Sequence, residues 1–292
     1  RLLPFFMSAL LFLSALFTLF SPLPIMLAHV RGKARFIFSA FLVNFLWVVV
    51  AAGWVSGGFY LCLIGSIGIA FPRYLLAGRS AESSIGFTFA WILGTLFIFG
   101  VVYFFATGQQ PWVTVQEQVA VMVDQLISTN QIQGPMSGGL PPEQVKQNLL
   151  KELPSAAAIF CLLSLWVNMT LFIRLGAPET VKRVSFRVDE FKRWKSPEWF
   201  IWPAILSGAT LLYDFGWASV VGVNVFKFMM AIYALQGLAI LSFFFDHFRL
   251  RGIFRSVLVL VIVFFMMPLL LGIGFFDLWF DFRAKLGQSK DT

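Results

Sequence analysis

Long uncharged stretches alternate with short charged ones along the whole chain. Several approach the roughly 20 residues that a helix needs to cross the hydrocarbon core of a bilayer. Because barrel strands would alternate polar and apolar residues, the structure that these tracts predict is helical. The uncharged tracts are Leu2 to Val30, Phe36 to Pro72, Ser83 to Gln116, Leu153 to Ile173, Trp199 to Tyr213, Phe228 to Phe245 and Ser256 to Phe276.

Breaks within the tracts raise the number of expected crossings. Ser21-Pro22-Leu23-Pro24 interrupts the first tract, since proline removes a helical hydrogen bond and disfavours helix in the residue before it. The 37 uncharged residues from Phe36 to Pro72 are too many for one span, so we expect two short helices separated at Ser56-Gly57-Gly58. The prediction is an all-α, polytopic integral membrane helical bundle, a single membrane domain over residues 1–292, with about eight transmembrane helices plus amphipathic interfacial helices.

Residues 107–153, called the outer hairpin below, carry four acidic and two basic side chains. A Gly-Pro-Met-Ser-Gly-Gly turn separates two segments whose apolar residues recur at helical spacing. We expect an extracytoplasmic, amphipathic helical hairpin that lies on the membrane surface or caps the bundle. Structural cover and a lid that gates a substrate are both open interpretations. Pro154 then fits the first turn of the next span.

Residues 174–198, called the basic segment below, carry seven basic and four acidic side chains. On a helix, Val181, Val184, Val188 and Phe191 would share one face. That pattern is typical of a helix in the anionic inner leaflet, and a docking site for a cytoplasmic partner is the alternative. The residues expected to contact lipid headgroups or the partner are Lys182, Arg183, Arg187, Lys192 and Arg193.

The distribution of charge predicts which segments lie on which side of the membrane. Loops rich in Lys and Arg stay in the cytoplasm, so we expect residues 31–35, 73–82, 174–198 and 246–255 there and the outer hairpin outside. The prediction is a multi-pass protein of the bacterial inner (cytoplasmic) membrane. The first tract lacks the small-residue cleavage site of a signal peptide, so we do not interpret it as one.

Composition supports this class of protein. The 292 residues are 59% hydrophobic and only 12% charged, against about 25% charged in soluble proteins, and the mean hydropathy is +0.83. A net charge of +8 would suggest nucleic acid in a soluble protein, but here the cationic loops explain it. The expected partners are therefore the lipid bilayer, anionic headgroups at the cytoplasmic face and another membrane subunit, and no nucleic acid.

Asp214 and Lys227 are nearly the only formal charges within the apolar helices. A Lys at the centre of a membrane helix costs roughly 3 kcal/mol, so such residues usually face a partner, the bundle interior or water. Asn224 and Gln236 lie in the same run, and we predict that the four side chains line a substrate-binding pocket. The alternative is that both charges lie near the outer surface, where Lys extends to water at little cost.

Residues with catalytic or metal-binding patterns are scarce. His29 and His247 have no Cys or carboxylate at metal-ligand spacing, so we expect no metal. Cys62 and Cys161 fall in apolar spans, as buried thiols do. The chain has no GxxxxGK[ST] loop, HExxH or GxSxG motif. We therefore predict neither an enzyme nor a cofactor.

Four stretches stand out by their order and spacing: Pro22-Leu23-Pro24 followed by Arg31-Gly32-Lys33; Phe191 to Trp199; Asn224 with Gln236-Gly237; and Gly272 to Asp277 with Trp279 and Asp281-Phe282-Arg283. With these stretches the chain resembles the YybS-like family of bacterial multi-spanning membrane proteins. That family is similar to the substrate-capture (S) subunits of energy-coupling-factor vitamin transporters. The resemblance implies a helical bundle with a pocket open to the outside.

Two functions from different classes follow. In the first, the protein is a transporter-like substrate-binding subunit whose external pocket is lined by Asp214, Asn224, Lys227 and Gln236. In the second, it is a non-catalytic scaffold or accessory subunit of a membrane protein complex, using the basic segment or the outer hairpin. The first requires that the four side chains converge on a polar cavity, whereas the second requires a continuous contact surface.

Overall fold

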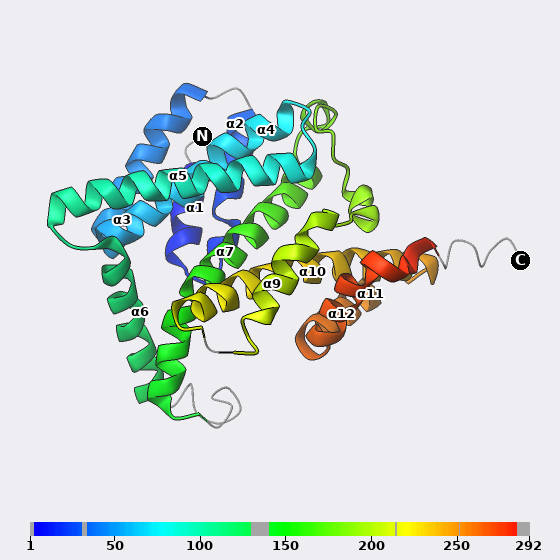
Figure 1. Ribbon diagram of the computed structural model, residues 1–292. Coiled ribbons are helices and arrows are strands. Elements are labelled where there is room, and N and C mark those ends of the chain that lie inside the picture. Colours follow the sequence, from blue (N-terminus) through cyan, green and yellow to red (C-terminus); the bar gives the residue numbers. More distant parts are fainter. Residues whose placement is uncertain (1–2, 31–33, 130–139, 214, 251, 285–292) are drawn as a thin grey trace, which may run out of the picture. The chain divides into compact units, whose positions relative to one another are not determined.

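The computed structural model describes residues 3–30, 34–129, 140–213, 215–250 and 252–284. Within these ranges every regular element is helical, which confirms the all-α prediction (Figure 1). Most of the chain lies in α1 (Leu3–Leu13), α2 (Pro22–Val30), α3 (Ala34–Phe59), α4 (Phe71–Leu76), α5 (Ala81–Thr107), α6 (Pro111–Ser128), α7 (Pro142–Leu175), α8 (Pro178–Val181), α9 (Ile201–Ala209), α10 (Trp217–His247), α11 (Gly252–Phe265) and α12 (Met267–Phe280). Shorter 3-10 or π turns are η1 (Thr18–Phe20), η2 (Tyr60–Ile64), η3 (Ser66–Ala70), η5 (Val188–Arg193) and η6 (Glu198–Phe200).

Four helical stretches of the described chain are long and apolar enough to cross a membrane: Ile37–Leu76, Ala81–Thr107, Pro142–Leu175 and Trp217–His247. A fifth span results if α11 and α12 are taken together, although they are bent by 94°. The described chain therefore has the candidate spans expected of a polytopic, helical membrane protein. The expected count of about eight spans is not confirmed.

Three expected spans are shorter or more broken than their apolar tracts. α1 has only 11 residues and is followed by an irregular turn in which Ala15 has a positive φ of 55°. The tract from Trp199 to Tyr213 gives α9, with 9 residues. The last tract breaks at Met266, because Pro268 in the first turn of α12 cannot donate the N–H that would continue the preceding helix.

The stretch Ile37–Leu76 is 40 residues long, about 60 Å as a straight helix and twice the hydrocarbon thickness. It bends at Gly53, whose φ of 83° and ψ of 170° are open to glycine and unfavourable for other residues. The break was predicted at Ser56-Gly57-Gly58, three residues later. The π turns η2 and η3 follow the bend.

The described residues pack as two compact units. The first comprises Arg1–Lys151 and Phe160–Val188, and the second comprises Glu152–Ile159 and Asp189–Thr292. In the first unit α1 packs on α2 and α3, and α5 on α4. Its core contains a polar cluster in which Ser8 Oγ lies 3.0 Å from Tyr60 Oη and the Asn44 amide donates to the same phenol oxygen at 3.1 Å. These buried polar groups therefore provide one another's hydrogen-bond partners.

In the second unit α10 packs against α9 and α12. α10 and α12 approach most closely where two glycines meet: a Cβ added at Gly274 would lie 1.9 Å from the Tyr233 carbonyl oxygen, and one added at Gly237 would lie 2.2 Å from that of Leu270. Small residues let helix backbones approach in this way. The crossing fixes the position of Gln236 on α10 relative to Asp277 on α12.

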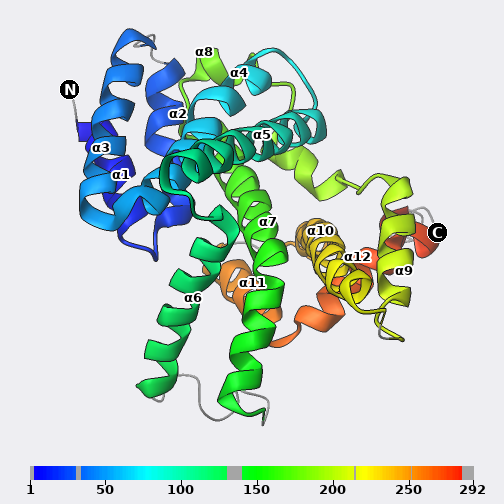
Figure 2. The same ribbon diagram turned by 60° about the vertical axis from the view of Figure 1, so that its left-hand side comes forward.

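The outer hairpin forms α6 and the beginning of α7, which lie side by side in both views (Figure 1, Figure 2). Asp124 and Lys146 connect them through an ion pair of 2.7 Å. The expected turn lies within residues 130–139, outside the described residues. Pro154 does not start a new helix, because α7 runs through it without interruption.

The amphipathic α-helix expected in the basic segment is not formed. α8 ends at Val181, and burial then alternates with a period of two, since Val184 and Phe186 are buried while Ser185 is exposed. This alternation belongs to an extended chain. Phe186 packs edge-on against Trp166 with a ring separation of 6.0 Å, which anchors the segment.

The basic segment therefore does not present its cations on one helical face. Lys182, Arg183 and Arg187 belong to the first unit, whereas Lys192 and Arg193 belong to the second. Lys182 lies 3.8 Å from the Glu179 carboxylate, and Lys192 forms an ion pair with Asp246. Their contact with headgroups or a partner stays a prediction.

Cysteine labelling tests the predicted sides of the membrane. Glu143 in the outer hairpin and Arg183 in the basic segment are both exposed. In a chain whose Cys62 and Cys161 are replaced by alanine, we expect Glu143→Cys to react with an impermeant maleimide in intact cells. Arg183→Cys should react only after permeabilisation. Protection of the first site in intact cells would overturn the predicted arrangement.

Candidate functional site

The Pro154 turn of α7 provides polar groups within an apolar helix. Proline has no N–H, so the carbonyl four residues earlier loses its helical donor. The next backbone N–H, that of Ser155, donates to Asn224 Oδ1 on α10 at 2.8 Å. The Ser155 hydroxyl donates to the Glu152 carbonyl at 2.8 Å. A side chain of α10 is thereby attached to the turn of α7 that contains Pro154.

Lys227 forms an ion pair with Glu152, three residues before Ser155 on α7. Both partners belong to the second unit. Their side chains are 41% and 35% exposed, respectively, so the pair is half-buried. Asn224 and Lys227, three residues apart on one face of α10, therefore meet the same turn of α7.

Lys227 lies deep in α10. It is 10 residues from Trp217 and 20 from His247, about 15 Å and 30 Å along the helix axis. A Lys near a helix end can extend its ammonium to the interface, but here the ammonium binds a carboxylate instead. A half-exposed ion pair within an apolar helix usually has water or a polar partner beside it.

The Asn224 amide has a defined orientation. Its Nδ2 donates to the Val220 carbonyl at 2.8 Å, while its Oδ1 accepts from Ser155. Exchanging the two atoms would break both bonds, so the assignment follows from the contacts. Asn224 thus holds the Pro154 turn against α10 and positions Glu152 beside Lys227.

Asp214 lies outside the described residues, so its predicted place beside Lys227 in the pocket stays untested. The partner that the described chain supplies is Glu152. This partner was not predicted, because Glu152 lies within the residues expected to form the outer hairpin. The available signal was an acid directly before Leu153-Pro154, where an apolar tract begins.

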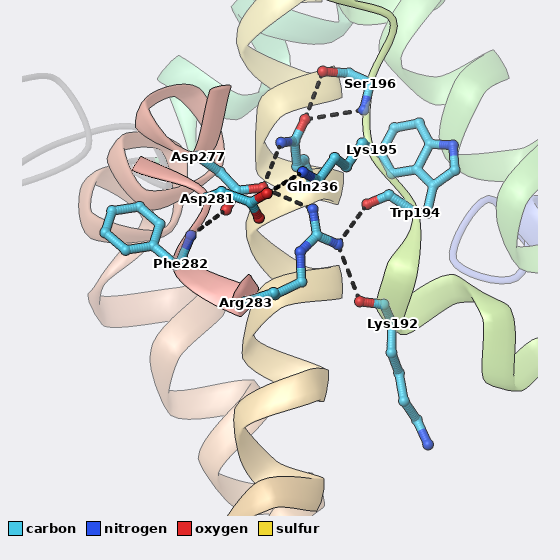
Figure 3. A network of polar contacts seen from close by, with 9 residues as sticks. All are labelled: Lys192, Trp194, Lys195, Ser196, Gln236, Asp277, Asp281, Phe282 and Arg283. Atoms are coloured by element: carbon cyan, nitrogen blue, oxygen red, sulfur yellow. Dashed lines mark hydrogen bonds and ion pairs between the residues drawn. The ribbon is translucent and has the colours of Figure 1, made fainter. Parts of the chain in front are cut away.

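Gln236 does not join this site. It is nine residues beyond Lys227, about 14 Å along α10, and is fully buried. Its Oε1 accepts from the Ser196 N–H at 3.0 Å and from the Ser196 hydroxyl (Figure 3). Its Nε2 donates to Asp277 Oδ2 at 3.1 Å. The structure therefore separates the predicted set, with Asn224 and Lys227 in one place and Gln236 in another.

Asp277 and Arg283 form the centre of the polar cluster that contains Gln236 and Ser196 (Figure 3). Arg283 Nη2 lies 2.7 Å from Asp277 Oδ2, and the two side chains are 8% and 0% exposed. Arg283 Nη1 also donates to the carbonyls of Lys192 at 3.1 Å and Trp194 at 2.9 Å. Buried charges are tolerated when paired and hydrogen-bonded in this way. Residues 192–196 are thereby held against α10 and the end of α12.

Two exposed ion pairs border this cluster. Lys195 lies 3.0 Å from Asp281, and both side chains are 48% exposed. The hydrogen bond from Lys195 lowers the pKa of the Asp281 carboxyl below its ordinary value. On the other side, Asp246 binds both Lys192 and Arg255. Lys192 is thus occupied within the chain.

Three of the four stretches quoted for the family resemblance meet in this cluster. Ser196 belongs to the second stretch, from Phe191 to Trp199, Gln236 to the third, and Asp277 with Arg283 to the last. The ion pair between Asp277 and Arg283 was not predicted from the sequence. An acid inside an apolar helix with a basic residue six positions later was the signal available.

The described residues hold no group of three His, Cys, Asp or Glu side chains placed to bind a metal ion. The comparison with protein families gives a match over residues 2–278 to the family described as "Predicted membrane protein (DUF2232)". The chain belongs to this family. No curated protein and no solved structure matches it.

The DUF2232 match includes Glu152, Asn224, Lys227 and Asp277, and ends five residues before Arg283. The family description states a membrane protein, which agrees with the apolar helices of this DUF2232 chain. It does not extend to the YybS-like name, to a likeness to S subunits or to a bacterial inner membrane. These remain predictions.

Proposed function

We propose that the chain is a transporter-like substrate-binding subunit of the bacterial inner membrane, with its site at Glu152, Ser155, Asn224 and Lys227. The observation that carries this proposal is the half-exposed Lys227–Glu152 ion pair far from either end of α10. Charges kept within apolar helices usually mark a path or site for a polar solute. The predicted topology places this pair toward the outside, where a capture subunit receives its substrate.

The residues named have different roles in such a site. Lys227 and Glu152 offer charges that can bind a solute, and they neutralise each other while no solute is bound. Asn224 fixes the turn that carries Glu152. Gln236, in the separate cluster around Asp277, contributes to the fold of the second unit and has no place at this site.

A non-catalytic scaffold or accessory subunit is the second candidate. The observation in its favour is the cluster around Asp277, which is closed by bonds within the chain and holds residues 192–196 rigidly. A fixed surface of this kind suits contact with another subunit. A scaffold of this type would not require the Lys227–Glu152 pair to bind any solute.

Metabolite capture separates the two candidates. The purified chain in lipid nanodiscs is incubated with a defined mixture of small polar metabolites, washed, and analysed by mass spectrometry. We expect the chain to retain at least one solute that Lys227→Met does not retain. Lys146→Met, which removes the cation of the hairpin's Asp124 pair, should retain it like the unmodified chain. Equal retention by all three chains contradicts a site at Lys227, and retention by none contradicts a binding function.

A further inference from the structure

The Lys227–Glu152 pair has hydrogen-bonding capacity to spare. An ammonium has three donors and a carboxylate about four acceptor positions, whereas the described part of the chain gives these two groups one ion-pair contact between them. The buried Asp277 carboxylate differs, because it accepts from Gln236, from Arg283 and from the Phe282 N–H. The first pair can therefore gain a ligand without losing a packed network.

From this contrast we propose that the Lys227–Glu152 site binds a zwitterion whose ammonium and carboxylate lie close together, the class that contains the α-amino acids. This inference rests on the proposed binding function and names its substrate class. The ligand's carboxylate accepts from the Lys227 ammonium, and its ammonium donates to the Glu152 carboxylate. Both bonds are charge-assisted and short.

Charge balance within the apolar helices favours a zwitterion. An anionic ligand that paired with Lys227 in place of Glu152 would leave the Glu152 carboxylate without a counter-charge. A cationic ligand that paired with Glu152 would likewise leave the Lys227 ammonium without one. A charge left without a partner within an apolar helix is unfavourable, even where the pair is only half-buried. A zwitterion replaces both partners at once, so neither charge is stranded.

The surrounding groups suit this exchange. Asn224 uses both amide atoms within the chain, and the Ser155 hydroxyl donates to the Glu152 carbonyl. These bonds position the turn and do not compete for the two charges. Glu152 and Lys227 come from different helices. A ligand that bridges the two groups therefore also bridges α7 and α10 in the second unit.

The test compares probes that share a carbon skeleton and differ in charge. L-alanine, propionate and ethylamine form one set, and L-leucine, 4-methylpentanoate and 3-methylbutylamine form another, with the remaining proteinogenic α-amino acids and betaine as further zwitterions. The readout is the thermal unfolding midpoint of the chain in nanodiscs against probe concentration. We expect at least one zwitterion to bind at least about tenfold more tightly than its matched carboxylate and amine.

Single substitutions should change which charge class of ligand the site binds most tightly. Glu152→Gln leaves Lys227 without its carboxylate partner. The site should then bind the matched carboxylate more tightly than the zwitterion. With Lys227→Met it should instead bind the matched amine more tightly. A merely structural ion pair would lower stability in both variants without this change. Lys146→Met serves as the control and should keep the preference of the unmodified chain.

The outcomes separate this inference from the proposal on which it rests. Tighter binding of a carboxylate or an amine by the unmodified chain overturns the zwitterion class and leaves a binding function standing. The absence of any shift with every charge class overturns both. If the two variants do not fold, the comparison of matched probes on the unmodified chain decides alone, because it requires no substitution.

Discussion

Arg283→Met is expected to lower the free energy of unfolding by about 3–5 kcal/mol, because it leaves the Asp277 carboxylate buried without its counter-charge. That carboxylate is fully buried, and Arg283 supplies its ion-pair partner at 2.7 Å. The substitution also removes the donor that two backbone carbonyls of residues 192–194 use. Unfolding in mixed detergent micelles with increasing SDS measures the change.

The neighbouring Lys195–Asp281 pair is the matched control. Both side chains are 48% exposed, so Lys195→Met should cost only about 0–1 kcal/mol. Adding Asp277→Asn to Arg283→Met should recover part of the loss, since the stranded charge is then removed. A loss under about 1 kcal/mol for Arg283→Met, or strict additivity of the two substitutions, would show that the buried pair does not stabilise the fold in this way.

The class of fold could be predicted from the sequence, but the positions at which its helices bend could not. The apolar tracts predict membrane helices because the cost of an unpaired backbone group in lipid is a local property of each tract. Where a tract bends is decided by single residues in context. Gly53 bends the stretch from Ile37 to Leu76, although the Ser56-Gly57-Gly58 run was the stronger sequence signal.

The basic segment shows a second kind of error. The spacing of Val181, Val184, Val188 and Phe191 fits a helix, but the spacing of Val184 and Phe186 fits an extended chain equally well. Packing of Phe186 against Trp166 decides between them. Trp166 lies 20 residues away in the sequence, so a local pattern could not reveal this contact.

The candidate site was found in part. Lys227 and Asn224 were recognisable because polar residues are rare in an apolar helix. Glu152, the partner of Lys227, is 75 residues away in the sequence. The partner of a buried charge depends on which helices cross and at which turn. For the same reason Gln236 was grouped with Lys227, although it binds Ser196 and Asp277.

Because α10 and α12 cross closely, we expect alanine substitutions at two glycines of α12 to differ in their effect on the free energy of unfolding. A Cβ at Gly274 would lie 1.9 Å from the Tyr233 carbonyl oxygen and 2.8 Å from the Gly237 nitrogen, whereas one at Gly272 meets nothing within 4 Å. Both positions are helical. They therefore share the roughly 1 kcal/mol by which alanine exceeds glycine in helix propensity.

Gly274→Ala should lower the free energy of unfolding by about 1–3 kcal/mol or more, because the two backbones must separate and backbone atoms cannot move aside as a flexible side chain can. Gly272→Ala should leave it unchanged or raise it by up to about 1 kcal/mol, since propensity acts there alone. SDS-driven unfolding of the two variants beside the unmodified chain measures both values. If Gly274→Ala proved as stable as Gly272→Ala, the helices would not cross at this glycine, and the alignment of Gln236 with Asp277 that depends on the crossing would fall with it.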